Sequence, residues 1–210
     1  AFFRAILLPA NEVPAINNPA RGVADVIASV VRDPAGQIVS GNIDVLLRTT
    51  LAAANTATGL NLHNGAAGQN VPVALSTALS SDNARPLQTG ADSLRLSIAV
   101  KNDNAAALAM LRAVFQDPTK FYLNLTSTDQ PSGLMRGQLV KAQVAVLMAI
   151  LTSDAVTPAA RNSGTGFGQV VAIGTRDAAG NWTSGEVYAW ATFTSDDPST
   201  FSGFHIHLGE

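Results

Sequence analysis

The chain contains no cysteine. Disulfide bonds, thiolate metal ligands and cysteine nucleophiles are therefore excluded. Charge is also scarce: only 13% of the 210 residues are charged, the net charge is -2, and the Lys and Arg residues are scattered along the chain. A protein that binds nucleic acid needs these residues gathered into a basic patch, so the composition argues against a nucleic-acid partner.

Long hydrophobic runs are missing as well. The longest apolar run, Val144 to Leu151, is far shorter than the roughly 20 residues of a transmembrane helix, so we expect no transmembrane segment and interpret this run as a β-strand. The chain starts without Met, inside the strand-like run Ala1 to Leu8. We interpret it as a mature periplasmic or extracellular protein whose signal peptide has been removed.

Most segments have the pattern of strands bounded by turn residues. Ala24–Val31 is followed by the turn Asp33–Gly36 and by a second strand-like run, Gln37–Leu47. Further along, Gln169–Thr175 and Glu186–Phe193 repeat this arrangement. Short strands with this spacing predict an all-β fold built from antiparallel sandwiches or a barrel.

One short helix is expected among these strands. Asn102-Asp103-Asn104 can cap the run Ala105–Phe115, and Asp117-Pro118 would end it. Because its apolar residues are nearly continuous, the helix should pack across an open end of a sandwich. Phe121–Leu125 and Met135–Val140 then follow as strands.

The chain matches itself without a gap at an offset of 144 residues. Gly22 falls on Gly166, Gly36 on Gly180 and His63 on His207. Such an offset predicts two copies of one domain, residues 1–142 and 143–210, the second holding only its N-terminal half.

The second copy carries a His-Ile-His triplet, and its His205 and His207 are two of the three histidines in the chain. Residues i and i+2 of a strand share a face, so the two rings could hold one copper or zinc ion. Two ligands make a weak site, which would need others from elsewhere. The alternative is a pair of structural histidines hydrogen-bonded to nearby backbone.

The first copy has Asn61 in place of the first of these histidines. His63 is therefore predicted to be structural, donating a hydrogen bond to a loop carbonyl or to Asn124 or Thr126. A metal site here is not expected, since one imidazole is gone.

Arg136 stands alone on an otherwise apolar strand, and Glu12 is its candidate partner in a structural ion pair that closes the sandwich. No pair of nucleophile and base stands out in the chain. We therefore predict no catalytic residue and a non-enzymatic protein.

The first copy contains four ordered motifs: Asn11-Glu12-Val13-Pro14, Asn61–Val73, Phe121–Thr126 and Pro131–Leu139. Together they resemble the CHRD domain, a module named after chordin and widespread in bacterial exported proteins. The resemblance implies an immunoglobulin-like or superoxide-dismutase-like β-sandwich. Two family histidines are replaced, by Asn61 and by Thr126, so a metal site formed by them would be largely lost in this copy.

The segment Gly203–His207 also resembles the Gly-Phe-His-Val-His strand of copper–zinc superoxide dismutases, in which both histidines bind copper. This likeness implies the sandwich fold and copper affinity. The chain lacks the further histidines that the dismutase site requires.

Half a sandwich would leave an open core and unpaired strand edges. A partner protein, self-assembly or strand donation between chains would close it, unless the natural chain itself continues. The sequence thus predicts an exported, non-enzymatic structural or interaction module, a subunit of a larger extracytoplasmic assembly. The alternative is a copper- or zinc-binding protein that uses His205 and His207.

Overall fold

The structure of the chain is a computed structural model that describes residues 1–156, 164–195 and 203–207. The chain divides into two compact units. The first contains Ala1–Gln143 and Thr175–Thr183, and the second contains Val144–Gly174 and Ser184–Glu210. The parts of the predicted second copy at 157–163, 196–202 and 208–210 lie outside the described residues.

The first sheet of the first unit is antiparallel. Its successive neighbours are the start of β10, then β1 (Phe2–Leu7), β2 (Arg21–Arg32), β3 (Ile38–Leu51) and β7 (Gly90–Val100). The turn between β2 and β3 places Gly36 at φ 80°, a conformation that glycine adopts without strain. The predicted hairpin is therefore confirmed, with both strands longer than expected.

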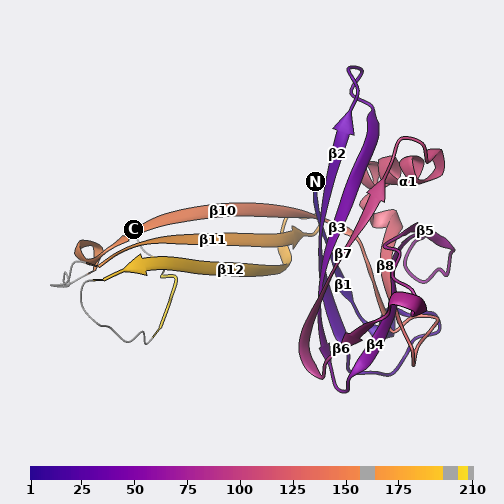
Figure 1. Ribbon diagram of the computed structural model, residues 1–210, viewed down its shortest axis with the longest axis horizontal. Helices are drawn as coiled ribbons and strands as arrows, with labels where there is room; N and C mark the ends of the chain where they lie inside the picture. The colour runs from indigo at the N-terminus through magenta and orange to yellow at the C-terminus, as the bar shows by residue number, and fades with distance from the viewer. Residues whose placement is uncertain (157–163, 196–202, 208–210) are drawn as a thin grey trace. The chain divides into compact units, whose positions relative to one another are not determined.

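The second sheet of this unit runs in the order β5 (Val73–Ser76), β4 (Asn55–Asn64), β8 (Phe121–Ser127) and β9 (Met135–Gln138), while β6 (Arg85–Leu87) pairs with one end of β4. Figure 1 shows the two sheets as separate layers. At one edge they are joined by a backbone bridge between Leu8 and Arg136. The first unit is thus an antiparallel β-sandwich, as the strand pattern predicted.

Alternate residues of both sheets fill the space between the layers. Phe3, Leu7, Val45 and Leu47 come from the first sheet, and Leu60, Leu62, Leu123 and Leu125 come from the second; all are buried. Period-two alternation is what a sheet with one covered face requires. Each layer therefore buries one apolar face against the other.

The helix α1 (Ala105–Gln116) forms where the sequence predicted it. The Asn104 side chain accepts a hydrogen bond from the backbone N–H of Ala107 and caps the first turn. Leu108, Leu111 and Val114 of α1 are buried in the sandwich core. The Leu111 side chain lies so close to β3 that a Cβ on Gly41 would be 2.9 Å from it.

A charged group lies on the outer face of the first sheet. Arg4 Nη1 and Arg48 Nη2 donate to the two carboxylate oxygens of Asp25, at 2.7 and 2.6 Å. Arg4 and Asp25 are buried. Removing the shared carboxylate would leave the buried Arg4 guanidinium without this acceptor.

The second unit is built from β10 (Val140–Thr152), β11 (Thr165–Arg176) and β12 (Trp182–Thr194), whose order in the sheet follows the chain. β10 begins in the first unit, where Arg4 and Phe3 pair with Val140 and Lys141. The sequence predicted Met135–Val140 as one strand, and this is wrong. The chain leaves β9 after Gln138, and Val140 already belongs to the strand that pairs with β1.

The 144-residue offset reappears in the element bounds. Adding 144 to β2 gives β11, and adding it to the 3₁₀ turn Pro9–Asn11 gives the turn Ser153–Ala155. Gly22 pairs with Thr49 across β2 and β3, and their counterparts Gly166 and Phe193 also lie next to each other. The family comparison below covers the first copy, so the tandem organisation remains a prediction.

Among the residues that the structure describes, no helix is long and apolar enough to cross a membrane. The longest apolar run of the sequence lies in β10, as its interpretation as a strand predicted.

Candidate functional site

Two of the predicted structural residues, His63 and Arg136, contact Tyr122 on the face of β4, β8 and β9 that points away from the core. The His63 ring stacks on Tyr122 with 4.7 Å between the ring centroids and an interplanar angle of 4°. The Arg136 guanidinium lies over the Tyr122 ring, 4.8 Å from its centroid. A cation over an aromatic face is attracted by the ring quadrupole. Sequence reasoning did not include Tyr122 in this cluster.

His63 is hydrogen-bonded to a loop carbonyl, one of the partners that the sequence suggested for it. Its Nδ1 lies 2.8 Å from the carbonyl oxygen of Val71. Because a carbonyl oxygen only accepts, Nδ1 carries the hydrogen. The N–H of Val71 in turn donates to the Tyr122 hydroxyl at 3.4 Å. Burial lowers the pKa of His63 and so favours the neutral form of the ring.

Arg136 fixes two loops to the edge of the sandwich. Its Nε donates to the carbonyl oxygen of Asn11 at 2.5 Å, and its Nη1 donates to Gln69 O and Asn70 Oδ1, both at 2.9 Å. The Asn70 amide continues the network to Val13 O at 2.7 Å. Arg136 is thus a buried tie between the loop before β2 and the loop after β4.

The expected ion pair between Arg136 and Glu12 is not formed. The guanidinium is engaged by backbone carbonyls, and Glu12 Oε1 is buried without a hydrogen-bond partner. Burial raises the pKa of Glu12 from 4.5 to about 7, and the nearby positive charge of Arg136 opposes this only in part. The sequence indicated the proximity of the two residues, but not that the carboxyl would be desolvated and left unpaired.

Asn61, Asn124 and Arg136 occupy one row across three strands, because Asn61 pairs with Asn124 and Asn124 pairs with Arg136. Asn124 donates to Ser132 O at 3.4 Å. The Thr126 hydroxyl lies 3.2 Å from that of Thr58. The row therefore consists of two amides and a guanidinium, and Asn61 itself stands where the family has a histidine. These groups are polar, but they are not a set of metal ligands.

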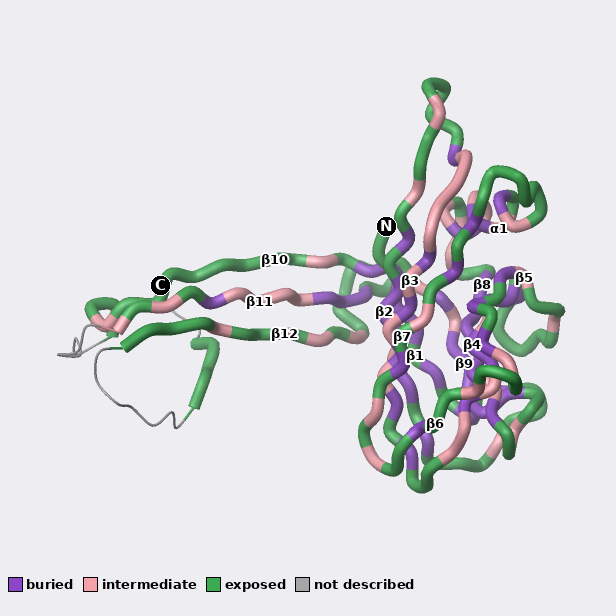
Figure 2. The backbone as a smooth tube through the Cα atoms, in the orientation of Figure 1, coloured by how far each residue is buried: buried purple, intermediate pink, exposed green. Residues whose placement is uncertain are grey.

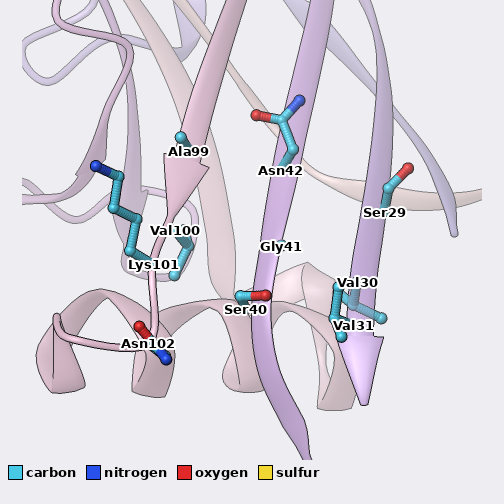
Figure 3. Close-up of a pocket in the computed structure, with 10 residues that line it drawn as sticks. All are labelled: Ser29, Val30, Val31, Ser40, Gly41, Asn42, Ala99, Val100, Lys101 and Asn102. Atoms are coloured by element: carbon cyan, nitrogen blue, oxygen red, sulfur yellow. The ribbon is translucent and has the colours of Figure 1, made fainter.

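A separate cavity of about 550 Å³ opens at the ends of β2, β3 and β7, beside α1 (Figure 3). Polar groups at its lining come from Ser29, Ser40, Asn42, Lys101 and Asn102. Lys101 is the one titratable side chain of this lining, and acid–base catalysis would need a positioned partner for it. Sequence analysis missed this cavity; the nearest signal was Gly41 in the middle of a strand pattern.

His205 and His207 lie in the second unit, with their ring centroids 6.2 Å apart and an interplanar angle of 81°. The described segment Gly203–His207 has no strand pairing, whereas the sequence predicted a strand here. Among the described residues, no group of three or more His, Cys, Asp or Glu side chains is placed to hold a metal. The structure therefore brings the two imidazoles near each other without further ligands of these types from the described part of the chain.

The second unit also exposes a large apolar surface. Figure 2 shows β10 and β12 as mostly exposed, whereas buried residues recur along the strands of the sandwich. Large exposed apolar side chains on β10, β11 and β12 in this unit are Val146, Leu147, Met148, Ile150, Leu151, Phe167, Val187, Trp190 and Phe193. Contiguous exposed apolar surface of this kind marks interaction sites. We call the sheet of β10, β11 and β12 in this unit the open sheet.

Comparison with protein families agrees with the fold and with the motifs of the first copy. The family model described as the CHRD domain matches residues 3–139, which include Glu12, His63, Tyr122 and Arg136. No curated protein and no solved structure matches the chain. Since the match covers more than half of the chain and coincides with the sandwich, the protein belongs to the CHRD domain family.

Proposed function

We propose that the protein is an exported, non-enzymatic interaction module whose first unit is a rigid scaffold and whose open sheet binds another protein. It would act outside the cytoplasm, as a subunit of a larger assembly. Membership of the CHRD family is consistent with this assignment. The absence of cysteine agrees with it but does not distinguish it from other roles.

The observation that carries the proposal is the chemistry of the open sheet. Ile150 is 81% exposed, and its neighbours in β10 from Val144 to Leu151 are all apolar. Glu186 is the one charged residue between Trp182 and Thr194 of β12. Exposing an apolar surface with so little charge to water is unfavourable in free energy. Such a surface also promotes aggregation unless something covers it.

The scaffold role rests on the polar network of the first unit. Arg136, His63 and Tyr122 hold the loops at one edge of the sandwich through hydrogen bonds and ring contacts. These side chains bind backbone carbonyls and an amide of the loops, and these hydrogen bonds make the loops rigid. Such a network stabilises a single arrangement of the domain.

Site-specific photocrosslinking in cells that produce the protein tests the proposal. A photoreactive residue placed at Leu147 or Ile150 should yield one discrete crosslinked product with a second polypeptide. The same residue placed at Asp103, which is exposed in the first unit, is the matched control and should give none. Equal patterns at the open sheet and at Asp103, or no product at any position, would count against an interaction function.

A second candidate function is copper or zinc binding by His205 and His207. It is favoured by the 6.2 Å separation of the two rings, since neutral imidazole is a common ligand of both metals. Elemental mass spectrometry after incubation with copper should then show uptake that His207→Ala abolishes and His63→Ala preserves. Equal effects of the two substitutions would eliminate this candidate.

A further inference from the structure

The strand β7 of the first unit has a long edge with which no described strand pairs. β7 is the last strand of its sheet, and β3 is its neighbour on the other side. It is 11 residues long, about twice the mean length of strands in globular proteins. An edge strand presents unpaired backbone groups, and natural proteins usually keep such edges short or cover them. An edge of this length is therefore a candidate interaction site.

Hydrogen bonds elsewhere in the sheet establish which residues of β7 face this edge. The N–H of Ala28 donates to Ala1 O at 2.9 Å, and the Ala1 amino group donates to Ala28 O at 2.7 Å. Ala28 therefore turns its backbone groups to β1, and its partner Ile43 turns its own to β7. Ile43 pairs with Ile98. Since backbone groups alternate between the two sides of a strand, the even-numbered residues of β7 bond to β3 and the odd-numbered ones face outward.

A contact near the start of β7 agrees with this assignment. The backbone N–H of Ser93 donates to Oδ1 of Asp92 at 2.7 Å, so it points away from β3. The Asp92 carboxylate thus occupies the first part of the edge. Beyond it, the backbone groups of Arg95, Ser97 and Ala99 face outward and bond to no other described element. We call these three residues the free edge.

The helix that follows β7 runs away from the free edge. Asn104 caps the first turn of α1 shortly after β7 ends. Further along the helix, Arg112 Nε donates to the carbonyl oxygen of Ile38 in β3 at 2.9 Å. Near its end, the Phe115 ring meets the Phe3 ring of β1 edge-to-face, with 6.1 Å between the centroids. α1 therefore crosses the core side of the sheet from β7 toward β1 and does not cover the free edge.

Unpaired charges of opposite sign stand beside the free edge. Asp44 of β3 pairs with Ser97 of β7, and the Ser97 hydroxyl donates to Oδ1 of Asp44 at 3.0 Å. Asp44 is half-buried and Arg95 is exposed. Neither forms an ion pair with a described residue. The free edge thus carries a cation at one position and, two residues further along, a hydroxyl bound to a carboxylate.

This pattern is complementary to itself. We propose that the free edge binds the free edge of a second copy of the chain, with the two β7 strands antiparallel about a two-fold axis at Leu96. Arg95 of each copy then lies opposite Ser97 of the other, and the two residues exchange backbone hydrogen bonds. Because Ser97 is bound to Asp44, the Arg95 guanidinium comes within reach of the other copy's Asp44. The surface lies in the first unit, so the inference does not depend on the function proposed for the open sheet.

Charge distinguishes this register from the adjacent ones. An axis at Arg95 would place the two guanidinium groups directly opposite each other, which destabilises a strand pair. An axis at Ser97 would place Arg95 opposite Ala99 and further from the carboxylate. With the axis at Leu96, both Arg95 side chains meet an Asp44. The half-buried Leu96 also packs against its own symmetry mate on the core side, as an isologous contact requires.

The contact is small, so the dimer is expected to be weak. One strand pair with its flanking side chains buries less than about 1,200 Å², which is the range of transient complexes. Backbone pairing and the two Arg95–Asp44 pairs fix the register more than they add affinity. Exposed charge pairs are also screened by salt. The proposal therefore predicts a monomer–dimer equilibrium that depends on protein concentration and on ionic strength.

Disulfide crosslinking tests the axis, because the chain has no cysteine of its own. Residue 96 would face its symmetry mate as a non-hydrogen-bonded pair, with about 4.5 Å between the Cα atoms, which a disulfide can span. Under mild oxidation, Leu96→Cys should form a linked dimer at least tenfold faster than the control Ser93→Cys, which lies opposite Ala99. Ser93 is exposed and Leu96 half-buried, so random collision would favour the control. Far-UV circular dichroism checks that both variants are folded.

Charge reversal tests the occupant without changing Leu96. In sedimentation equilibrium, Arg95→Glu and Asp44→Arg should each weaken the dimer at least tenfold, because like charges then face each other in both copies. An equimolar mixture of the two variants should dimerise again, since each reversed charge meets the reversed charge of the other chain. An effect within one chain would not recover on mixing.

Three results would overturn the inference. One is a wild-type chain that stays monomeric up to about 1 mM, because even a weak dimer would then be absent. The second is equal crosslinking of Leu96→Cys and Ser93→Cys, which would mean random collision. The third is a dimer that neither charge reversal weakens, because it would use another surface. None of these results bears on photocrosslinking at the open sheet, so the proposed function would still stand.

Discussion

Replacing Glu12 by glutamine should stabilise the protein at neutral pH and not in mild acid. The Glu12 side chain is 6% exposed and its Oε1 has no hydrogen-bond partner. Burial raises its pKa from 4.5 to about 7, so the folded state holds the proton more tightly than the unfolded state does. Glutamine keeps the size of the side chain and removes the charge.

The sign and size of the effect follow from proton linkage. Below pH 4.5 the carboxyl is protonated in both states, so it has no pH-dependent effect on stability. Between pH 4.5 and about 7 the folded state binds more protons than the unfolded state, and the free energy of unfolding of the wild type falls as pH rises. The difference between 4.5 and about 7 corresponds to about 3 kcal/mol at 1.36 kcal/mol per pH unit.

Urea unfolding followed by far-UV circular dichroism at pH 4 and pH 7.5 measures this difference. At pH 7.5 the midpoint of Glu12→Gln should lie higher by about 1 M urea or more, for slopes of 1–3 kcal/mol/M. At pH 4 the two proteins should unfold at nearly the same urea concentration. The control is Asp129→Asn, at an exposed position of the first unit, and it should follow the wild type at both pH values. Equal stabilities of Glu12→Gln and wild type at pH 7.5 would refute the assignment of a desolvated carboxyl.

Four further substitutions test the packing of the first unit by the same unfolding assay. Gly137→Ala should lower the free energy of unfolding by about 3 kcal/mol or more, because the added Cβ would overlap the backbone of Ile6. Gly36→Ala is the comparison: Gly36 has φ 80° and no atom within 4 Å of the added Cβ, so this substitution should lower the free energy of unfolding by only about 1 kcal/mol. Arg136→Lys should cost about 2–4 kcal/mol, since an ammonium cannot reproduce the planar fork that reaches two loops; a loss below 0.5 kcal/mol would contradict the described network. Asp25→Asn should cost about 3 kcal/mol by leaving two guanidinium groups without their shared carboxylate, and a neutral effect would mean that solvent replaces it.

Local patterns predicted the fold of the first unit well, because strands, turns and helix ends depend on neighbouring residues. The turn that ends at Gly36 and the helix capped by Asn104 lie where the sequence predicted them. The division between β9 and β10 was missed, since Met135–Val140 is continuously strand-like and its end is set by pairing with β1 rather than by a local signal.

The candidate site was only partly predictable. His63, Asn124 and Arg136 were identified from their motifs, and the loop carbonyl that binds His63 was one of the expected partners. Tyr122 and the acceptors of Arg136 were not identified. Arg136 is 125 residues from Asn11 and 67 from Gln69, and no local pattern specifies contacts between positions so far apart.

The sequence by itself determined the strand-rich fold class, the β2–β3 hairpin, the helix and the family, and it indicated the second copy of the pattern. Alternation, turn residues and the 144-residue offset are properties of the chain read in order. Only the tertiary structure decided which faces are covered, because burial depends on what lies across the core. The raised pKa of Glu12 and the lowered pKa of His63 follow from burial in the first unit, and Leu147 is exposed because nothing covers it in the second. The Glu12→Gln test depends on the burial of Glu12, and the proposed function depends on the exposed sheet.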